Sequence, residues 1–400
     1  MPSICIYFQV HQPARLRRYS FLEDKKSGLQ DAYFDDKLNE KVFNKVTEKC
    51  YMPTNRLLLE LLQKHRGRFK VSYSITGVFL EQCQKYRPDL LETFKQLADT
   101  GCVDFLNETY FHSLCSLFSD PEKKEFHEQV EMHKSALKKI TGISPKVFRN
   151  TEALFSNDIA RLAEGMGYKG IVSEGIERVL GWRSPNYLYS VKNCKRIKLL
   201  MRNYKLSDDV AYRFSARWWN EWPLTAEKYS AWLKGTPGHV INLFMDYETF
   251  GEHQWADTGI FDFLRYFPDY ALKYPELDFR TPSEVVEDYK ALGELDVPDV
   301  ISWADNERDA SAWLGNDMQR MAFSLLQELE PMVRKNKDKE MLHVWRLLQN
   351  SDHLYYLCTK CLADGDVHKY FSHYQNPYEG FINYMNILRD FKERIEGGKK

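Results

Sequence analysis

Short apolar runs alternate with segments of helical periodicity over about the first 250 residues. The runs predict six β-strands, at residues 4–10, 70–76, 103–106, 146–149, 170–173 and 239–245. Apolar residues at helical spacing predict helices between them, at residues 56–65, 80–98 and 159–166. Such alternation is typical of a parallel sheet with helices outside it, and it fits an open sheet and a closed barrel equally well. No Gly-x-Gly-x-x-Gly follows the first run, which weakens the dinucleotide-binding interpretation.

Two polar segments carry signals that begin a helix. Asp120 precedes Pro121, which predicts Asp120 as the N-cap and Pro121 as the first helical residue. The segment Thr281-Pro282-Ser283-Glu284 combines a threonine cap, a first-turn proline and a capping-box glutamate.

The pattern changes near residue 300. Helical periodicity then dominates, and it predicts helices at residues 317–329, 340–348, 355–362 and 378–394. No flexible linker separates this part from the strands, so we expect a small helical domain packed rigidly against the sheet.

Composition and charge exclude several classes of protein. The 400 residues include 56 Lys plus Arg and 57 Asp plus Glu, and the net charge of −1 argues against a broadly basic nucleic-acid binder. No apolar run is long enough to span a membrane, and the N-terminus lacks the features of a signal peptide. The 8 Cys are scattered, and we interpret Cys358 and Cys361 as helix-face thiols. We therefore expect a cytoplasmic protein with no nucleic-acid or membrane partner.

Polar residues stand where the predicted strands end. His11 and Gln12 follow the first strand, Glu81 comes shortly after the second, Asn107 and Glu108 follow the third, and Glu152 comes shortly after the fourth. The last strand leads into Asp246 and Glu248, and His253 follows. Because the carboxyl ends of parallel strands carry the working groups of α/β folds, these residues predict a common site.

Each of these residues also has a structural interpretation. His11 could be a core histidine, Glu152 a carboxylate at a helix N-terminus and Asp246 an N-cap. Their convergence on five strand ends favours a site instead. The chain has neither the His-x-x-x-His spacing of a zinc site nor the Gly-x-Ser-x-Gly of a serine hydrolase. Two carboxylates amid 24 Phe, 24 Tyr and 9 Trp point to glycosyl transfer, because sugars pack on aromatic faces.

Five segments in order carry a family resemblance. They are His11-Gln12-Pro13, residues 77–81 (GVFLE, which departs from the commoner form in its middle), residues 149–152 (RNTE), residues 246–251 (DYETFG) and residues 351–356 (SDHLYY). With these segments the sequence resembles glycoside hydrolase family 57, which contains α-amylases, 4-α-glucanotransferases and related α-glucan enzymes. The resemblance covers nearly the whole chain.

The resemblance implies an α/β fold and a mechanism. Residues 1–295 would form an incomplete seven-stranded (β/α) barrel, and residues 296–400 a C-terminal helical bundle that completes the active site. Glu152 would be the nucleophile and Asp246 the acid/base of a retaining enzyme. Neither a catalytic metal nor a cofactor is expected.

Further residues are expected to bind the substrate. Those that would contact sugar hydroxyls or orient the catalytic groups are His11, Gln12, Glu81, His112, Glu248, His253, Asp352 and His353. The residues that would stack on sugar rings are Trp218, Trp219, Trp222 and Trp255. The four tryptophans have a core interpretation as the alternative, and Asp352 with His353 an alternative as a helix-capping pair.

Three functions stay open on the sequence alone. The first is hydrolysis of α-1,4-glucosidic bonds in an α-glucan or maltooligosaccharide. The second is transfer of a glucan chain to another glucan, as in a 4-α-glucanotransferase. The third is a non-catalytic carbohydrate-binding protein. The sequence leaves the oligomeric state open.

Overall fold

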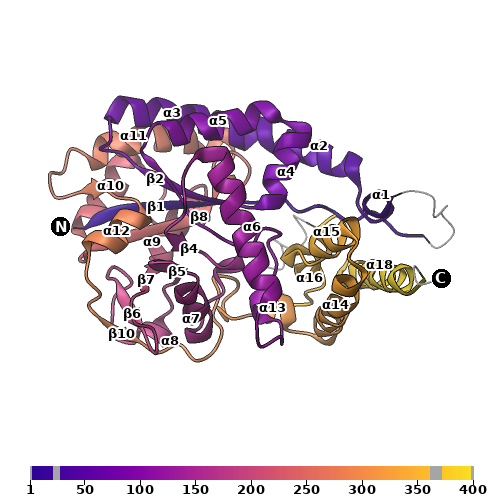
Figure 1. The fold of residues 1–400 in the computed structure, drawn as a ribbon. Coiled ribbons are helices and arrows are strands. Elements are labelled where there is room, and N and C mark those ends of the chain that lie inside the picture. Colours follow the sequence, from indigo (N-terminus) through magenta and orange to yellow (C-terminus); the bar gives the residue numbers. More distant parts are fainter. Residues whose placement is uncertain (1, 21–27, 361–371, 398–400) are drawn as a thin grey trace.

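Two β-sheets, built mostly from parallel strand pairs, form the centre of the molecule (Figure 1). The computed structural model describes residues 2–20, 28–360 and 372–397. The first sheet has the order β3-β2-β1-β8, with β9 beside β1. Its strands are β1 (Ser3–Val10), β2 (Val71–Ile75), β3 (Val103–Phe105), β8 (Val240–Asp246) and β9 (Asp278–Phe279).

The second sheet has the order β10-β6-β7-β5-β4, and only its β6–β7 pair is antiparallel. Its strands are β4 (Val147–Phe148), β5 (Gly170–Glu174), β6 (Tyr189–Val191), β7 (Lys198–Arg202) and β10 (Gly293–Leu295). The six strands expected from the sequence are confirmed as β1, β2, β3, β4, β5 and β8. The sequence did not predict β6, β7, β9 and β10, which have only two to five residues each.

The two sheets meet along two lines. Asn107, two residues after β3, forms a parallel bridge with Phe148 of β4. On the other side, the backbone N–H of Asn203, just after β7, donates to the carbonyl oxygen of Asn242 in β8 (2.9 Å). These contacts bring the ends of strands from both sheets to one region of the molecule.

The helices before residue 290 mostly cover the outside of the sheets, whereas α1 packs against α15 (Lys339–Leu348) in the C-terminal part (Figure 1). They are α1 (Leu29–Tyr33), α2 (Asp36–Val46), α3 (Met52–His65), α4 (Gly77–Tyr86), α5 (Pro88–Asp99), α6 (Lys124–Thr141), α7 (Asn157–Gly165), α8 (Glu177–Leu180), α9 (Tyr204–Ala211), α10 (Ala226–Gly235), α11 (Ile260–Ala271) and α12 (Pro282–Asp288). The capping box predicted at Thr281 is present, with both of its hydrogen bonds.

Two expected helix bounds are wrong. Residues 80–98 form two helices, because Pro88 has no N–H to continue the first one and Arg87 takes an extended φ of −143°. Helix α6 begins at Lys124 and not at Pro121, after Lys123 in a left-handed conformation. The carboxylate of Asp120 instead accepts hydrogen bonds from the backbone N–H groups of Glu122 and Lys124.

The C-terminal part is helical, as expected. Its described helices are α13 (Ser311–Leu314), α14 (Asp317–Asn336), α15 (Lys339–Leu348), α16 (Ser351–Tyr355) and α18 (Pro377–Gly397). The helix expected at 355–362 is wrong in its described part, because α16 ends at Tyr355. Cys358 therefore does not lie on a helix face, and Cys361 lies outside the described residues. None of the helices in the described ranges is long and apolar enough to cross a membrane.

Buried contacts join the C-terminal helices to the strands. One cluster of buried apolar side chains contains Phe148 of β4 and Met201 of β7 together with Trp345 of α15. Buried Glu125 of α6 accepts hydrogen bonds from Arg334 of α14 and Arg346 of α15. The C-terminal helices are thus held firmly against α6, while the domain boundary at residue 295 stays a prediction.

Candidate active site

A polar cavity of about 350 Å³ opens where β1, β4 and β8 end. Eight residues expected in the site line it: His11, Gln12, His112, Glu152, Asp246, Glu248, His253 and Asp352. Strand ends supply most of them, and α16 supplies Asp352. The structure therefore brings together residues that lie up to 341 positions apart in sequence.

The loop after β4 holds Glu152 in an unusual backbone conformation. Its φ of 56° and ψ of 26° lie in the left-handed region, which costs a residue with a Cβ about 1–2 kcal/mol. The loop is fixed on both sides of Glu152. The side chain of Asn150 donates to the carbonyl oxygen of Leu154 (3.1 Å), and the hydroxyls of Thr151 and Thr109 lie 2.6 Å apart. Residues held in this way are frequently functional, because the strain fixes a side chain in one direction.

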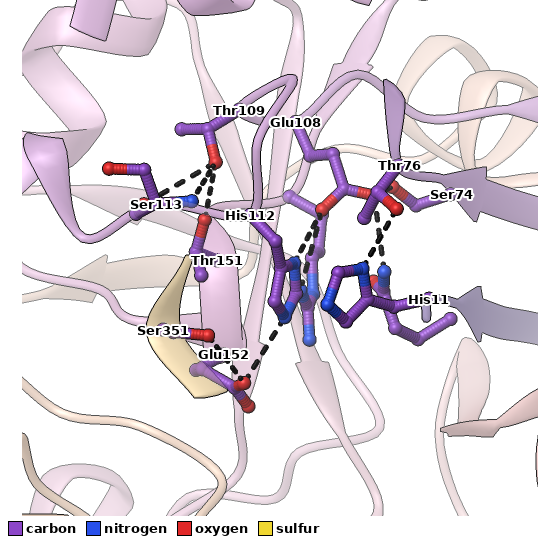
Figure 2. A network of polar contacts seen from close by, with 12 residues as sticks. His11, Ser74, Thr76, Glu108, Thr109, His112, Ser113, Thr151, Glu152 and Ser351 are labelled. Atoms are coloured by element: carbon purple, nitrogen blue, oxygen red, sulfur yellow. Dashed lines mark hydrogen bonds and ion pairs between the residues drawn. The ribbon is translucent and has the colours of Figure 1, made fainter. Parts of the chain in front are cut away.

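Three donors surround the carboxylate of Glu152. His112 Nε2 donates to Oε1 (3.1 Å), and Ser351 Oγ donates to the same oxygen (3.2 Å) (Figure 2). Trp303 Nε1 donates to Oε2 (3.0 Å). Burial alone would raise the pKa of Glu152, but the hydrogen bond and the positive charge of His112 lower it below 4.5. Glu152 is therefore an ionised, oriented carboxylate at neutral pH.

His112 lies between two carboxylates. Its Nδ1 donates to Oε2 of the fully buried Glu108 (3.1 Å), while its Nε2 contacts Glu152 (Figure 2). Burial would lower the pKa of His112, but the two carboxylates raise it to about 9. The pKa of Glu108 falls to about 2, because His112 outweighs the effect of burial. His112 is thus an imidazolium that bridges two anions.

The ring of His11 stacks on that of His112, with their centroids 4.0 Å apart (Figure 2). Its Nδ1 lies 2.8 Å from Thr76 Oγ1, and its Nε2 lies 3.1 Å from Asp352 Oδ2. Burial and the charge of His112 lower the pKa of His11 below 6.5. At neutral pH the contact with Asp352 is therefore a hydrogen bond from a neutral imidazole, and it ties β1 to α16.

Asp246, at the end of β8, has the opposite protonation preference to Glu152. Burial and the negative charge of Glu152 raise the pKa of Asp246 to about 6. Burial and the charge of Asp246 raise the pKa of the nearby Glu248 to about 8, although Tyr51 donates a hydrogen bond to it. The cavity thus contains one strongly ionised carboxylate and two carboxyl groups that hold protons more readily.

A buried ionic network supports the wall of the cavity that carries Trp303. Arg202 of β7 donates to Glu174 (2.9 Å) and to Asp208. Arg308 donates to Glu174 (2.7 Å) and to the carbonyl oxygen of Trp303 (2.6 Å). This network connects the loop after β10 to the ends of β5 and β7.

Six residues expected in the site do not line the cavity. Glu81 lies in a separate small cavity, where Tyr110 donates to it (2.9 Å) and burial raises its pKa to about 7. His353 is buried against Tyr384, and burial lowers its pKa to about 3. Three of the four tryptophans are exposed to solvent: Trp218 (79%), Trp222 (44%) and Trp255 (54%). The fourth, Trp219, packs against the core.

The sequence analysis assigned no contact with Glu152 to Glu108, Arg149, Ser351 or Trp303. Glu108 and Arg149 stand at strand ends, where their position was a usable signal. Ser351 belongs to the last of the five family segments. Trp303 lies in an irregular segment 151 positions from Glu152, and no local pattern marks its contact. In the described residues, no group of three or more His, Cys, Asp or Glu side chains is arranged to hold a metal ion.

Two carboxyl groups with different pKa values in one cavity at the ends of parallel strands are typical of enzymes that act on glycosidic bonds. The sequence model of Glycosyl hydrolase family 57 matches residues 5–298, and the chain belongs to this family.

Three comparisons give further detail. A Methanocaldococcus jannaschii protein named "Putative alpha-amylase" is 49% identical over 98% of this chain and 85% of its own length. The 4-alpha-glucanotransferase of Thermococcus litoralis has a TM-score of 0.68 at 15% identity over 96% of this chain, which spans 59% of that enzyme. A family 57 branching enzyme of Pyrococcus horikoshii has a TM-score of 0.71 at 14% identity over 99% of this chain and 94% of its own. The two structures show the shared fold.

Proposed function

We propose that this protein is a retaining glycoside hydrolase that cleaves α-1,4-glucosidic bonds of α-glucans through a covalent glycosyl-enzyme. One observation carries the proposal: Glu152 and Asp246 line the same cavity, and their surroundings move their pKa values apart. An ionised carboxylate beside a protonated one is the requirement of a retaining glycosidase. The carboxyl groups are expected to lie roughly 5–5.5 Å apart in the complex with substrate.

In the first step, an oxygen of Glu152 attacks the anomeric carbon of the sugar. The bond between that carbon and the glycosidic oxygen breaks, and the carboxylic acid of Asp246 gives its proton to the leaving oxygen. The donors His112, Trp303 and Ser351 fix the direction of Glu152 before the attack.

In the second step, Asp246 is a carboxylate and removes a proton from the incoming water. The water oxygen bonds to the anomeric carbon, and the bond to Glu152 breaks, which restores the ionised Glu152 and the protonated Asp246. Two inversions at the anomeric carbon leave its configuration unchanged.

The substrate-binding assignments follow from the cavity. His11, Gln12, Glu248, His253 and Asp352 present polar atoms suited to sugar hydroxyls. The relative named as an α-amylase supports an α-glucan as substrate. Glu81, His353 and the four tryptophans do not line this cavity. If any of them contacts a glucan, it would contact sugar units that extend outside the cavity.

We also propose the architecture that the family resemblance implies. Strands β1, β2, β3, β4, β5, β7 and β8 supply the seven strands of an incomplete barrel, and the contacts at Asn107 and Asn203 support its closure. Helices α13, α14, α15, α16 and α18 correspond to the C-terminal bundle.

Substitution of the two carboxyl groups tests the mechanism. Asp246→Asn should lower kcat on maltooligosaccharides roughly 10²–10⁴-fold, and Glu152→Gln at least as much. Asp104→Asn is the matched control, because Asp104 is a buried carboxyl of β3 that does not line the cavity. Proton NMR of the first-formed reducing end should show the α-anomer. Near-full activity of Glu152→Gln, or initial release of the β-anomer, would overturn the assignment.

Product analysis separates the remaining functions. A hydrolase converts maltoheptaose only to shorter sugars, whereas a 4-α-glucanotransferase also makes longer chains from it. A carbohydrate-binding protein would retain a glucan without releasing reducing ends. The presence of two carboxyl groups with different pKa values in one cavity favours an enzyme.

A further inference from the structure

Arg149 is an exception to the way charged groups are buried in this protein. Its side chain is fully buried, yet none of its three guanidinium nitrogens has a hydrogen-bond partner in the described part of the chain. The neighbouring Arg202 shows the usual arrangement, with two carboxylates and a carbonyl oxygen as acceptors. A buried cation that makes no hydrogen bond is costly, so a stable protein is expected to keep it only for a purpose.

The contacts of Arg149 lead to Glu152. The centre of the guanidinium lies 4.8 Å from the ring of Trp303, whose indole N–H donates to Glu152 Oε2. A planar guanidinium over an indole is a favourable cation–π arrangement. Arg149 Nη1 also lies 3.9 Å from Glu108 Oε2, which already accepts a hydrogen bond from His112.

The cavity that lies beside the guanidinium of Arg149 is too small to hold an anionic ligand. The cavity beside Arg149 has a volume of about 10 Å³, which is the size of a single water molecule. Its lining includes Ser173, whose hydroxyl also lacks a partner among the described residues, and Glu174, whose carboxylate disfavours an anion. The charge of Arg149 therefore acts on the carboxylates around it.

We propose that Arg149 is a positioning residue for the nucleophile: it lies over the ring of Trp303 so that the indole N–H stays directed at Glu152, and its positive charge, which makes no hydrogen bond within the described residues, favours the ionised carboxylate. The role rests on the proposed function, because it concerns the same nucleophile. The positive charge of Arg149 also acts to lower the pKa values of Glu152 and Asp246, although burial is the larger influence on each.

The substitution Arg149→Met removes the charge and keeps an unbranched apolar side chain. Both limbs of the pH profile of kcat/KM should then move upward by about 1 pH unit, because both carboxyl groups lose a favourable positive charge. The rate at the optimum should fall about tenfold, since Trp303 is no longer fixed. A residue that only filled space would lower the rate without moving the limbs.

Two further variants separate charge from packing. Arg149→Lys keeps the positive charge but loses the planar guanidinium over the indole of Trp303. Both limbs of the pH profile of kcat/KM should therefore stay in place while the rate at the optimum falls. Arg394→Met is the control. Arg394 of α18 lies over the ring of Tyr33 in α1, outside the cavity, so this variant also loses a positive charge and a ring contact, together with a hydrogen bond to Asp390. The control should leave the pH profile unchanged.

A spectroscopic measurement does not depend on glucan activity. In ¹⁵N-labelled protein the indole N–H signal of Trp303, assigned by its loss in Trp303→Phe, should titrate with Glu152. Its midpoint should move to higher pH in Arg149→Met and stay in place in Arg149→Lys. If Arg149→Met does not fold, Arg149→Lys alone tests the proposal. In that variant the chemical shift of the Trp303 indole N–H should change, while the midpoint of its titration should stay the same.

The outcomes are distinct. If neither the limbs nor the indole midpoint moves in Arg149→Met, or if Arg149→Lys shifts them as much as Arg149→Met does, the proposal is overturned. If the wild-type protein releases no reducing ends from any glucan while the indole midpoint still moves as expected, the proposed function fails and the role of Arg149 stands.

Discussion

At the scale of residues, the environment of each carboxyl group decides its chemistry. Glu152 and Asp246 are both partly buried, but only Glu152 accepts hydrogen bonds from the imidazolium of His112 and the N–H of Trp303 among the described residues. Asp246 has no such donor set among the described residues, and burial together with the negative charge of Glu152 raises its pKa to about 6. Two ordinary acidic residues thereby acquire the different protonation states that a retaining mechanism requires.

This difference predicts the pH dependence of activity. Glu152 must be ionised and Asp246 protonated, so kcat/KM should be highest between the lowered pKa of Glu152, below 4.5, and the pKa of Asp246 at about 6. Above about pH 6, kcat/KM should fall roughly tenfold per pH unit as Asp246 loses its proton. Initial rates on maltooligosaccharides from pH 3 to 9 measure the profile. A basic limb that stays near pH 6 in Asp246→Asn would contradict the assignment.

The sequence revealed the residues that follow strands and missed those brought in from elsewhere. His11, Glu152 and Asp246 come directly after apolar runs, so the topology of a parallel sheet was enough to predict that they meet. Trp303 reaches Glu152 only through a contact across 151 positions. Local sequence could not distinguish it from Trp218 or Trp222, which are exposed outside the cavity.

At the scale of elements, strong periodicity was a reliable guide and short or interrupted segments were not. The six apolar runs became strands, whereas β7 lies in a stretch rich in Lys and Arg that hides its apolar centre. The helical pattern of apolar residues continues past Tyr355, but α16 ends there because the following residues are held by tertiary contacts. The side chain of Asn316 donates to the carbonyl oxygen of Leu357 (2.9 Å), which secures the chain where it leaves the helix.

The contact between α6 and α15 predicts a large effect on stability. Glu125 is 1% exposed and accepts two hydrogen bonds from Arg346 (2.8 and 3.1 Å). Arg346→Met should lower the free energy of unfolding by about 3 kcal/mol, because it leaves a buried carboxylate with one cation fewer. Urea denaturation followed by far-UV circular dichroism measures this value.

The matched control is Arg320→Met on α14, since Arg320 pairs with the exposed Asp317. Its effect should stay below about 1 kcal/mol. Equal losses in the two variants would show that the buried pair contributes no more than an exposed one.

At the scale of the whole molecule, helix α16 of the C-terminal part contributes to the cavity. Ser351 donates to Glu152, and Asp352 contacts His11, so α16 reaches both the fourth and the first strand ends. Their packing on α6 and on the second sheet keeps these contacts in place. The helical pattern of this part was evident in the sequence, but its contacts with the strand ends depend on the assembled tertiary structure.

The link between Asp352 and His11 predicts a pH dependence of stability. The hydrogen bond from His11 outweighs burial and lowers the pKa of Asp352 to about 2, below its ordinary 3.8. Its contribution to the free energy of unfolding, about 2 kcal/mol, is therefore full above pH 4 and is lost as the pH falls towards 2. Urea denaturation of Asp352→Asn and the wild type should differ most at neutral pH and converge near pH 2.

A constant difference between the two proteins from pH 2 to 7 would exclude this linkage. Asp317→Asn is the control at an exposed site, and it should change the free energy of unfolding by less than about 0.5 kcal/mol.

The separation of His11 and Asp352 along the chain has a consequence for protein synthesis. The two residues lie 341 positions apart, and the ribosome adds about 5–20 residues per second. Roughly 20–70 s therefore pass between the synthesis of His11 and that of Asp352. During this time the loop that carries Glu152 is synthesised well before its donor Ser351, so the hydrogen-bonded arrangement around Glu152 cannot be completed until α16 has been made.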